Sequence, residues 1–152
     1  MKKVGTGLLI ASVVSFASGP ISAQVPLAVT GPSPISLDLG IEAARAAIRE
    51  CESLNSKATV VISDLRGLSV VLSEPGTSPE AFNIALKEIG VVMRMNATGG
   101  VGVDTPIPKN GAIPIFKIGG IVNVIAVAGA MNSETDQRCA EAGLYKIADR
   151  LK

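Results

Sequence analysis

The chain has 152 residues, with 14 basic and 13 acidic side chains and no histidine. A near-neutral charge without a basic run gives no electrostatic footprint for nucleic acid or anionic lipid, so we expect neither as a partner. The absence of histidine excludes a Ser-His-Asp or Cys-His catalytic arrangement, an imidazole zinc site and a histidine-ligated haem.

The N-terminal segment has the order of residues that is typical of a secretory signal peptide. Lys2 and Lys3 precede an apolar run from Val4 to Phe16, and small residues close the segment. This pattern predicts a signal peptide over residues 1–23 and an exported protein, either periplasmic or secreted. The apolar run is too short for a membrane span, which needs ~20 residues. Cleavage would remove both lysines and change the net charge from +1 to −1, so we expect no membrane association afterwards.

An extended leader is predicted over residues 24–35, because prolines interrupt a segment of little charge. A single domain is expected over residues 36–152. It opens with a helix that Ser36 or Asp38 caps and that continues to about Leu54. One face of this helix is apolar and the other is charged, so we expect the first to be buried and the second to face solvent.

Two strand-like runs come next, from Ala58 to Leu65 and from Leu68 to Ser73, with Arg66-Gly67 between them. This arrangement predicts a β-hairpin. Asp64 lies just before the turn, where we expect its side chain to accept hydrogen bonds from the backbone ahead of it.

A second helix is predicted from a cap at Ser78 to about Asn96, with Ile89 and Met93 on its buried stripe. The Gly- and Pro-rich residues 98–110 then predict a loop. Within it, Gly99-Gly100-Val101-Gly102 lacks the lysine and hydroxyl residue of a phosphate-binding loop and opens no clear helix. A connector is therefore favoured over a nucleotide site.

The C-terminal third predicts a second hairpin followed by a third helix. Two apolar runs, residues 112–116 and 121–127, flank Gly119-Gly120, which would supply the positive φ of a tight turn. Asn132 or Ser133 caps the helix that follows, and acidic residues occupy its first turn. Pro114, Gly119-Gly120 and Asn123 interrupt this apolar stretch, and its β-branched residues favour buried strands over a membrane-spanning helix.

Four motifs follow one another in fixed order in this third of the chain. They are Gly111-Ala112-Ile113-Pro114-Ile115, Gly119-Gly120, Ala126-Val127-Ala128-Gly129-Ala130, and Asp136 followed by Cys139-Ala140-Glu141-Ala142-Gly143-Leu144. In this order they resemble the C-terminal half of the GlcG/HbpS family of small haem-binding proteins, and residues 39–48 resemble its opening helix. The resemblance implies an α+β fold, in which an antiparallel sheet of two hairpins has helices packed largely on one face. It also implies a homo-oligomer, which exposed strand edges make physically reasonable.

The same resemblance implies haem, or a related flat molecule, as a ligand that is bound or sensed rather than transformed. Without histidine, the iron ligands that the matching region offers are Met131, Tyr145 and Cys139. Each has a structural interpretation as well, since Met131 can fill a gap, Tyr145 can lie at the helix surface and Cys139 can be buried. Binding by packing alone, or at a subunit interface, also stays open.

Cys51 and Cys139 are the cysteines of the chain. In an oxidising compartment they can pair, and the alternative is two buried thiols that never meet. The family fold implies that the first and last helices pack side by side, which would bring the two residues within reach of a disulfide.

No catalytic residue and no metal site is expected. Asp64, Asp104, Glu134 and Asp136 lie in predicted turns or at helix starts, and their spacing pairs no two of them for acid and base catalysis. Besides a haem-binding protein, two interpretations stay open: a ligand-free oligomeric interaction module and an enzyme that acts on a small metabolite. The missing histidine favours the first of these two.

Overall fold

The structure, a computed structural model, describes residues 32–99 and 109–152. The predicted signal peptide, the leader up to residue 31 and residues 100–108 of the predicted loop lie outside these ranges. The elements are α1 (Leu37–Ser53), β1 (Thr59–Asp64), β2 (Leu68–Ser73), α2 (Ala81–Ala97), β3 (Ala112–Lys117), β4 (Gly120–Ala128) and α3 (Ser133–Ile147), followed by a 3-10 turn over Ala148–Arg150.

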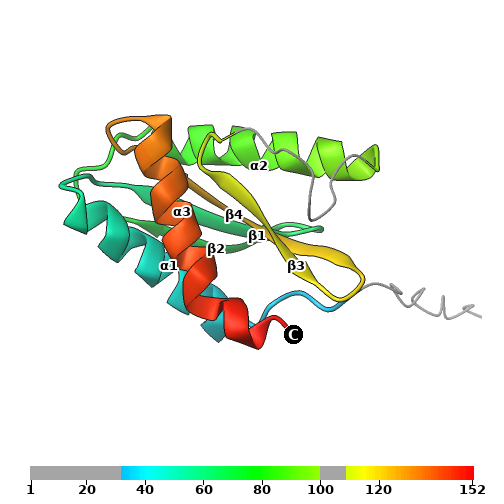
Figure 1. The fold of residues 1–152 in the computed structure, drawn as a ribbon. Coiled ribbons are helices and arrows are strands. Elements are labelled where there is room, and N and C mark those ends of the chain that lie inside the picture. Colours follow the sequence, from blue (N-terminus) through cyan, green and yellow to red (C-terminus); the bar gives the residue numbers. More distant parts are fainter. Residues whose placement is uncertain (1–31, 100–108) are drawn as a thin grey trace, which may run out of the picture.

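The four strands form one antiparallel sheet in the order β2-β1-β4-β3, so the two hairpins lie side by side (Figure 1). The predicted α+β fold with an antiparallel sheet of two hairpins is therefore confirmed. Two of the three helices, α1 and α3, share one face of the sheet and pack against each other. The third helix, α2, covers the opposite face, which was not foreseen from the sequence.

The two central strands are buried on both faces. Ile62 of β1 and Ile125 of β4 are paired and point toward α1 and α3, whereas their neighbours Val61 and Ala126 are paired and point toward α2. Strands covered on both sides are expected to be apolar throughout rather than alternating. This explains the continuous apolar runs over residues 60–62 of β1 and 124–128 of β4.

Helix starts follow the predicted capping in two of three cases. Ser36 caps α1 and Asn132 caps α3, each by accepting a backbone N–H of the first turn. Ser78 was predicted to cap α2, but the helix begins at Ala81, and the Ser78 hydroxyl accepts the N–H of Glu80 in the turn before it.

The tight turn of the second hairpin also differs by one residue from the prediction. Lys117 pairs with Gly120, so the two turn residues are Ile118 and Gly119 rather than Gly119 and Gly120. Both glycines have positive φ, at 102° and 134°. Among the described residues no helix is long and apolar enough to cross a bilayer.

The last residues of the predicted leader are docked on the sheet. Ile35 is buried, and its N–H donates to Oδ1 of Asn123 on β4 at 2.8 Å. Lys117 also donates from Nζ to the carbonyl oxygen of Ser33 at 3.3 Å. The packed domain therefore begins a few residues before α1.

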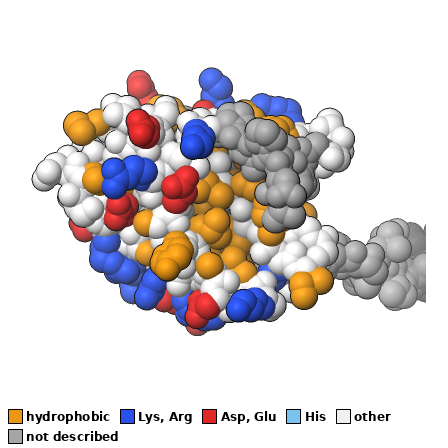
Figure 2. Space-filling view, in the orientation of Figure 1, with side chains coloured by type: hydrophobic (Ala, Val, Ile, Leu, Met, Phe, Trp, Pro, Cys, Tyr) orange, Lys and Arg blue, Asp and Glu red, His pale blue; other side chains and the backbone are white. Residues whose placement is uncertain are grey.

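Hydrophobic side chains also gather at the surface between α3 and β3 (Figure 2). Ile113 of β3 and Leu144 of α3 are half-buried there and pack against the core under α1 and α3. The homo-oligomer predicted from the sequence would have an apolar surface available on this side.

Candidate ligand-binding pocket

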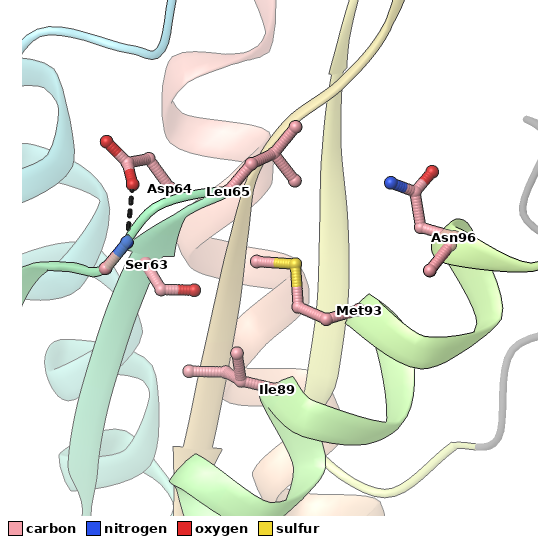
Figure 3. Close-up of a pocket in the computed structure, with 8 residues that line it drawn as sticks. Ser63, Asp64, Leu65, Ile89, Met93 and Asn96 are labelled. Carbon is pink, nitrogen blue, oxygen red and sulfur yellow. Dashed lines mark hydrogen bonds between the residues drawn. The ribbon is translucent and has the colours of Figure 1, made fainter.

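A pocket of about 430 Å³ lies between the β1–β2 turn and the C-terminal half of α2 (Figure 3). Its volume is in the ~300–1,000 Å³ range that is typical of small-molecule sites. The side chains of Ile89 and Met93 reach from α2 toward β1, and Leu65, which is 53% exposed, lies at the rim. The residues that line the pocket are Ser63, Asp64, Leu65, Gly67, Ile89, Met93, Asn96 and Ala97.

Ser63 places a hydroxyl beside the apolar side chains of Ile89 and Met93. The residue is 3% exposed, and its side chain points toward α2 (Figure 3). Within the described part of the chain, its Oγ has no hydrogen-bond partner. A buried hydroxyl without a partner costs roughly 1–3 kcal/mol. Ser56, Asn110 and Asn123 also carry such an atom, but of these four residues only Ser63 lines this pocket, where a ligand can complete the contact.

A β-bulge lies directly beside this serine. Ile62 pairs with Val70 but Ser63 pairs with Leu68, so Ser69 has no partner on β1. Bulges change the direction of neighbouring side chains and are common beside binding sites. The extra residue is on β2, while β1 keeps its register with β4 through Ser63 and Asp64, so the bulge changes the course of β2 beside the pocket.

Asp64 has the turn role that was predicted from the sequence. Its Oδ1 accepts the backbone N–H groups of Arg66 at 2.7 Å and of Gly67 at 2.8 Å. These bonds, led by the one from Arg66, lower the pKa of the Asp64 carboxyl despite partial burial. The carboxylate points away from Ile89 and Met93 (Figure 3), so it belongs to the turn rather than to the interior of the pocket.

The three residues proposed from the sequence as iron ligands lie elsewhere. Met131, in the loop between β4 and α3, is 76% exposed, and Tyr145 on α3 is 84% exposed. Cys139 is buried and forms a disulfide with Cys51, at a Cα–Cα distance of 5.4 Å. The bridge prevents Cys139 from offering a thiolate while it is intact, and none of the three residues lines the pocket.

Met93 is the sulfur-bearing residue that the sequence analysis placed in the core without assigning it a ligand role. A methionine on an apolar helix stripe usually fills space, so its position alone does not separate packing from ligation.

The sequence signal that could have indicated the pocket is Ser63, a polar residue after three apolar ones in a strand with a buried face. That Met93 lies opposite Ser63 depends on how α2 crosses the sheet, which the sequence does not specify.

The described residues contain no group of three or more His, Cys, Asp or Glu side chains that could hold a metal ion. Asp136, predicted at the start of α3, is buried and accepts the N–H of Ala130 at 3.0 Å. Burial raises the pKa of its carboxyl. The hydrogen bond closes the loop before α3, so we assign Asp136 a structural role.

A family model described as haem degrading protein HbpS-like matches residues 35–145. The chain belongs to the HbpS-like family. This confirms the resemblance found in the sequence. The domain is similar to a double mutant of Streptomyces reticuli HbpS, with 23% identity, a TM-score of 0.61, and coverage of 89% of this chain and 97% of the other.

Two further solved structures share the HbpS-like fold. One is the Klebsiella pneumoniae protein ORFY, with 15% identity, a TM-score of 0.64, and coverage of 77% of this chain and 92% of that one. The other is PduOC in complex with haem, with 17% identity, a TM-score of 0.59, and coverage of 75% and 95%. No match was found among curated protein sequences. Identities this low establish a common fold.

The pocket of this HbpS-like chain fits a flat apolar ligand in two respects and departs from haem in one. Ile89 and Met93 form an apolar wall, and a methionine thioether is a known axial ligand of haem iron. The Ser63 hydroxyl has no counterpart on intact haem, because the edge of the macrocycle opposite the propionates carries only methyl and vinyl groups.

Proposed function

We propose that this HbpS-like protein binds haem or a related flat tetrapyrrole in the pocket between α2 and the β1–β2 turn. Membership of the family and the haem complex of its structural relative PduOC support the ligand class. The observation that carries the choice of site is Met93, whose thioether faces β1 across an apolar pocket in a chain without histidine. When haem is bound, it would supply the iron that this thioether ligates.

We propose binding rather than catalysis. The family description names haem degradation, and any proton transfer to a bound ligand needs groups that hold or move protons beside it. Among the described residues that line the pocket, Asp64 is the one with an acidic or basic side chain, and its carboxylate accepts the backbone N–H groups of Arg66 and Gly67 in the turn. The remaining walls are apolar or neutral, so they favour retention of a ligand over its chemical change.

An absorbance titration with haemin tests the proposed site. The protein should give a saturable Soret shift, and Met93→Leu should weaken the affinity roughly tenfold or more, because leucine keeps the packing and removes the sulfur. Met95→Leu is the matched control, since Met95 lies on the same helix but does not line the pocket. It should bind haemin as the unmodified protein does.

Two other outcomes of this titration would contradict the proposal. A Soret shift that survives Met93→Leu but is lost in Met131→Leu or Tyr145→Phe would move the site to these exposed residues, which were offered as iron ligands from the sequence. A spectrum identical to that of free haemin would favour the ligand-free interaction module.

We also propose that the protein is exported. The pattern of residues 1–23 supports this, and so does the disulfide, because such bonds persist in oxidising compartments. Protein recovered from the periplasm or medium should begin near Gln24, and in denaturant, which exposes both residues, Cys51 and Cys139 should resist alkylation until a reductant is added. A cytoplasmic protein of full length whose thiols alkylate directly would contradict the assignment.

A further inference from the structure

The Ser63 hydroxyl has no hydrogen-bond partner among residues 32–99 and 109–152. Its neighbours across the pocket are the aliphatic side chain of Ile89 and the thioether of Met93. A hydrocarbon offers no hydrogen bond, and a thioether sulfur is only a weak acceptor. A ligand that fills this pocket with a purely hydrocarbon edge would leave the hydroxyl unpaired.

The group that pairs with Ser63 has to be neutral. No lysine or arginine is among the described residues that line the pocket. A ligand that pointed a carboxylate into the pocket would therefore lose the hydration of that group without gaining a cation as its partner. Arg66 is beside the turn, but its side chain is 69% exposed and lies 3.6 Å from Asp64. A neutral carbonyl can accept from the Ser63 hydroxyl without that penalty.

We propose that the pocket prefers an open-chain tetrapyrrole to the intact macrocycle and recognises it through a hydrogen bond from Ser63 to a terminal lactam carbonyl. Opening the macrocycle leaves a lactam on each of the two end rings, which puts a neutral acceptor at the leading edge of a flat apolar molecule. The propionates stay on the two middle rings and remain in solvent. This inference rests on the proposed tetrapyrrole site and specifies its ligand.

Biliverdin and haemin, titrated side by side, test the preference. The unmodified protein should bind biliverdin more tightly than haemin. Ser63→Ala should weaken biliverdin binding about tenfold, which corresponds to one hydrogen bond to a buried group, and should leave haemin binding unchanged. Ser69→Ala is the matched control, because this serine lies at the adjacent bulge, is exposed and does not line the pocket. It should leave both affinities unchanged.

Thermal melting of the ligand-free proteins separates binding from folding. Ser63→Ala should melt at the same temperature as the unmodified protein or higher, because the substitution removes an unpaired buried hydroxyl. If Ser63→Ala leaves both affinities intact, or weakens both equally, the lactam contact is wrong although the tetrapyrrole site stands. If neither pigment binds, the proposed function itself is wrong.

Discussion

Replacing Cys51 and Cys139 with alanine is expected to lower the free energy of unfolding by about 4–5 kcal/mol, the largest effect predicted for this chain. The disulfide joins α1 to α3 across a sequence separation of 88 residues. Closing so long a loop removes much of the conformational entropy of the unfolded chain. Both residues are fully buried, so reagents should reach the bond only when the helices separate.

Urea unfolding of the oxidised protein, the reduced protein and the double alanine variant measures this contribution. The reduced protein and the variant should have similar midpoints, both well below that of the oxidised protein. The variant should not respond to added reductant, which controls for effects of the reductant elsewhere. A difference below about 1 kcal/mol would mean that the unfolded chain gains little freedom when the bond is absent, contrary to the loop-entropy model.

Loss of this bond should leave the candidate pocket intact as long as the domain stays folded. The disulfide joins α1 to α3 on one face of the sheet, whereas Ser63 of β1 and Met93 of α2 line a pocket on the other face. The two faces are separated by strands whose residues are buried on both sides. The disulfide and the candidate pocket therefore lie in different layers of the fold, and we expect their effects on stability and on ligand binding to be independent.

The parts of the fold that depend on local sequence were predictable. Ser36 and Asn132 cap helices because short polar side chains can accept N–H groups of the first turn, and both hairpins follow from apolar runs around turn residues. The position of α2 was not predictable, because its apolar stripe is compatible with either face of a sheet. The choice depends on the order of the strands, which is a non-local property.

The candidate pocket was not predictable for the same reason. Ser63 and Met93 are ordinary residues of a strand and a helix until the packing of α2 against β1 brings them to one pocket. Cys51 and Cys139 were a pair that the sequence allowed without deciding between a bond and two thiols. Only the packing of α1 on α3 decided it.

That packing requires a glycine, and Gly143→Ala is expected to lower the free energy of unfolding by about 1–3 kcal/mol. A Cβ at this position of α3 would lie 2.8 Å from the backbone oxygen of Ala43 and 2.8 Å from Cδ1 of Ile125. The first of these contacts is with the backbone of α1, which cannot move aside as a side chain can. The helices would have to separate, and the disulfide between them restricts that movement.

Gly90→Ala is the matched control, because the same substitution in α2 should have the opposite sign. A Cβ at Gly90 would meet only the guanidinium end of Arg94, at 3.3 Å, and this flexible side chain can turn away. Without a packing penalty, alanine should stabilise the helix by up to about 1 kcal/mol through its higher propensity. Urea midpoints that move in opposite directions would establish that helix packing, rather than propensity, determines the residue at position 143. A Gly143→Ala protein as stable as Gly90→Ala would show that α1 and α3 do not approach so closely.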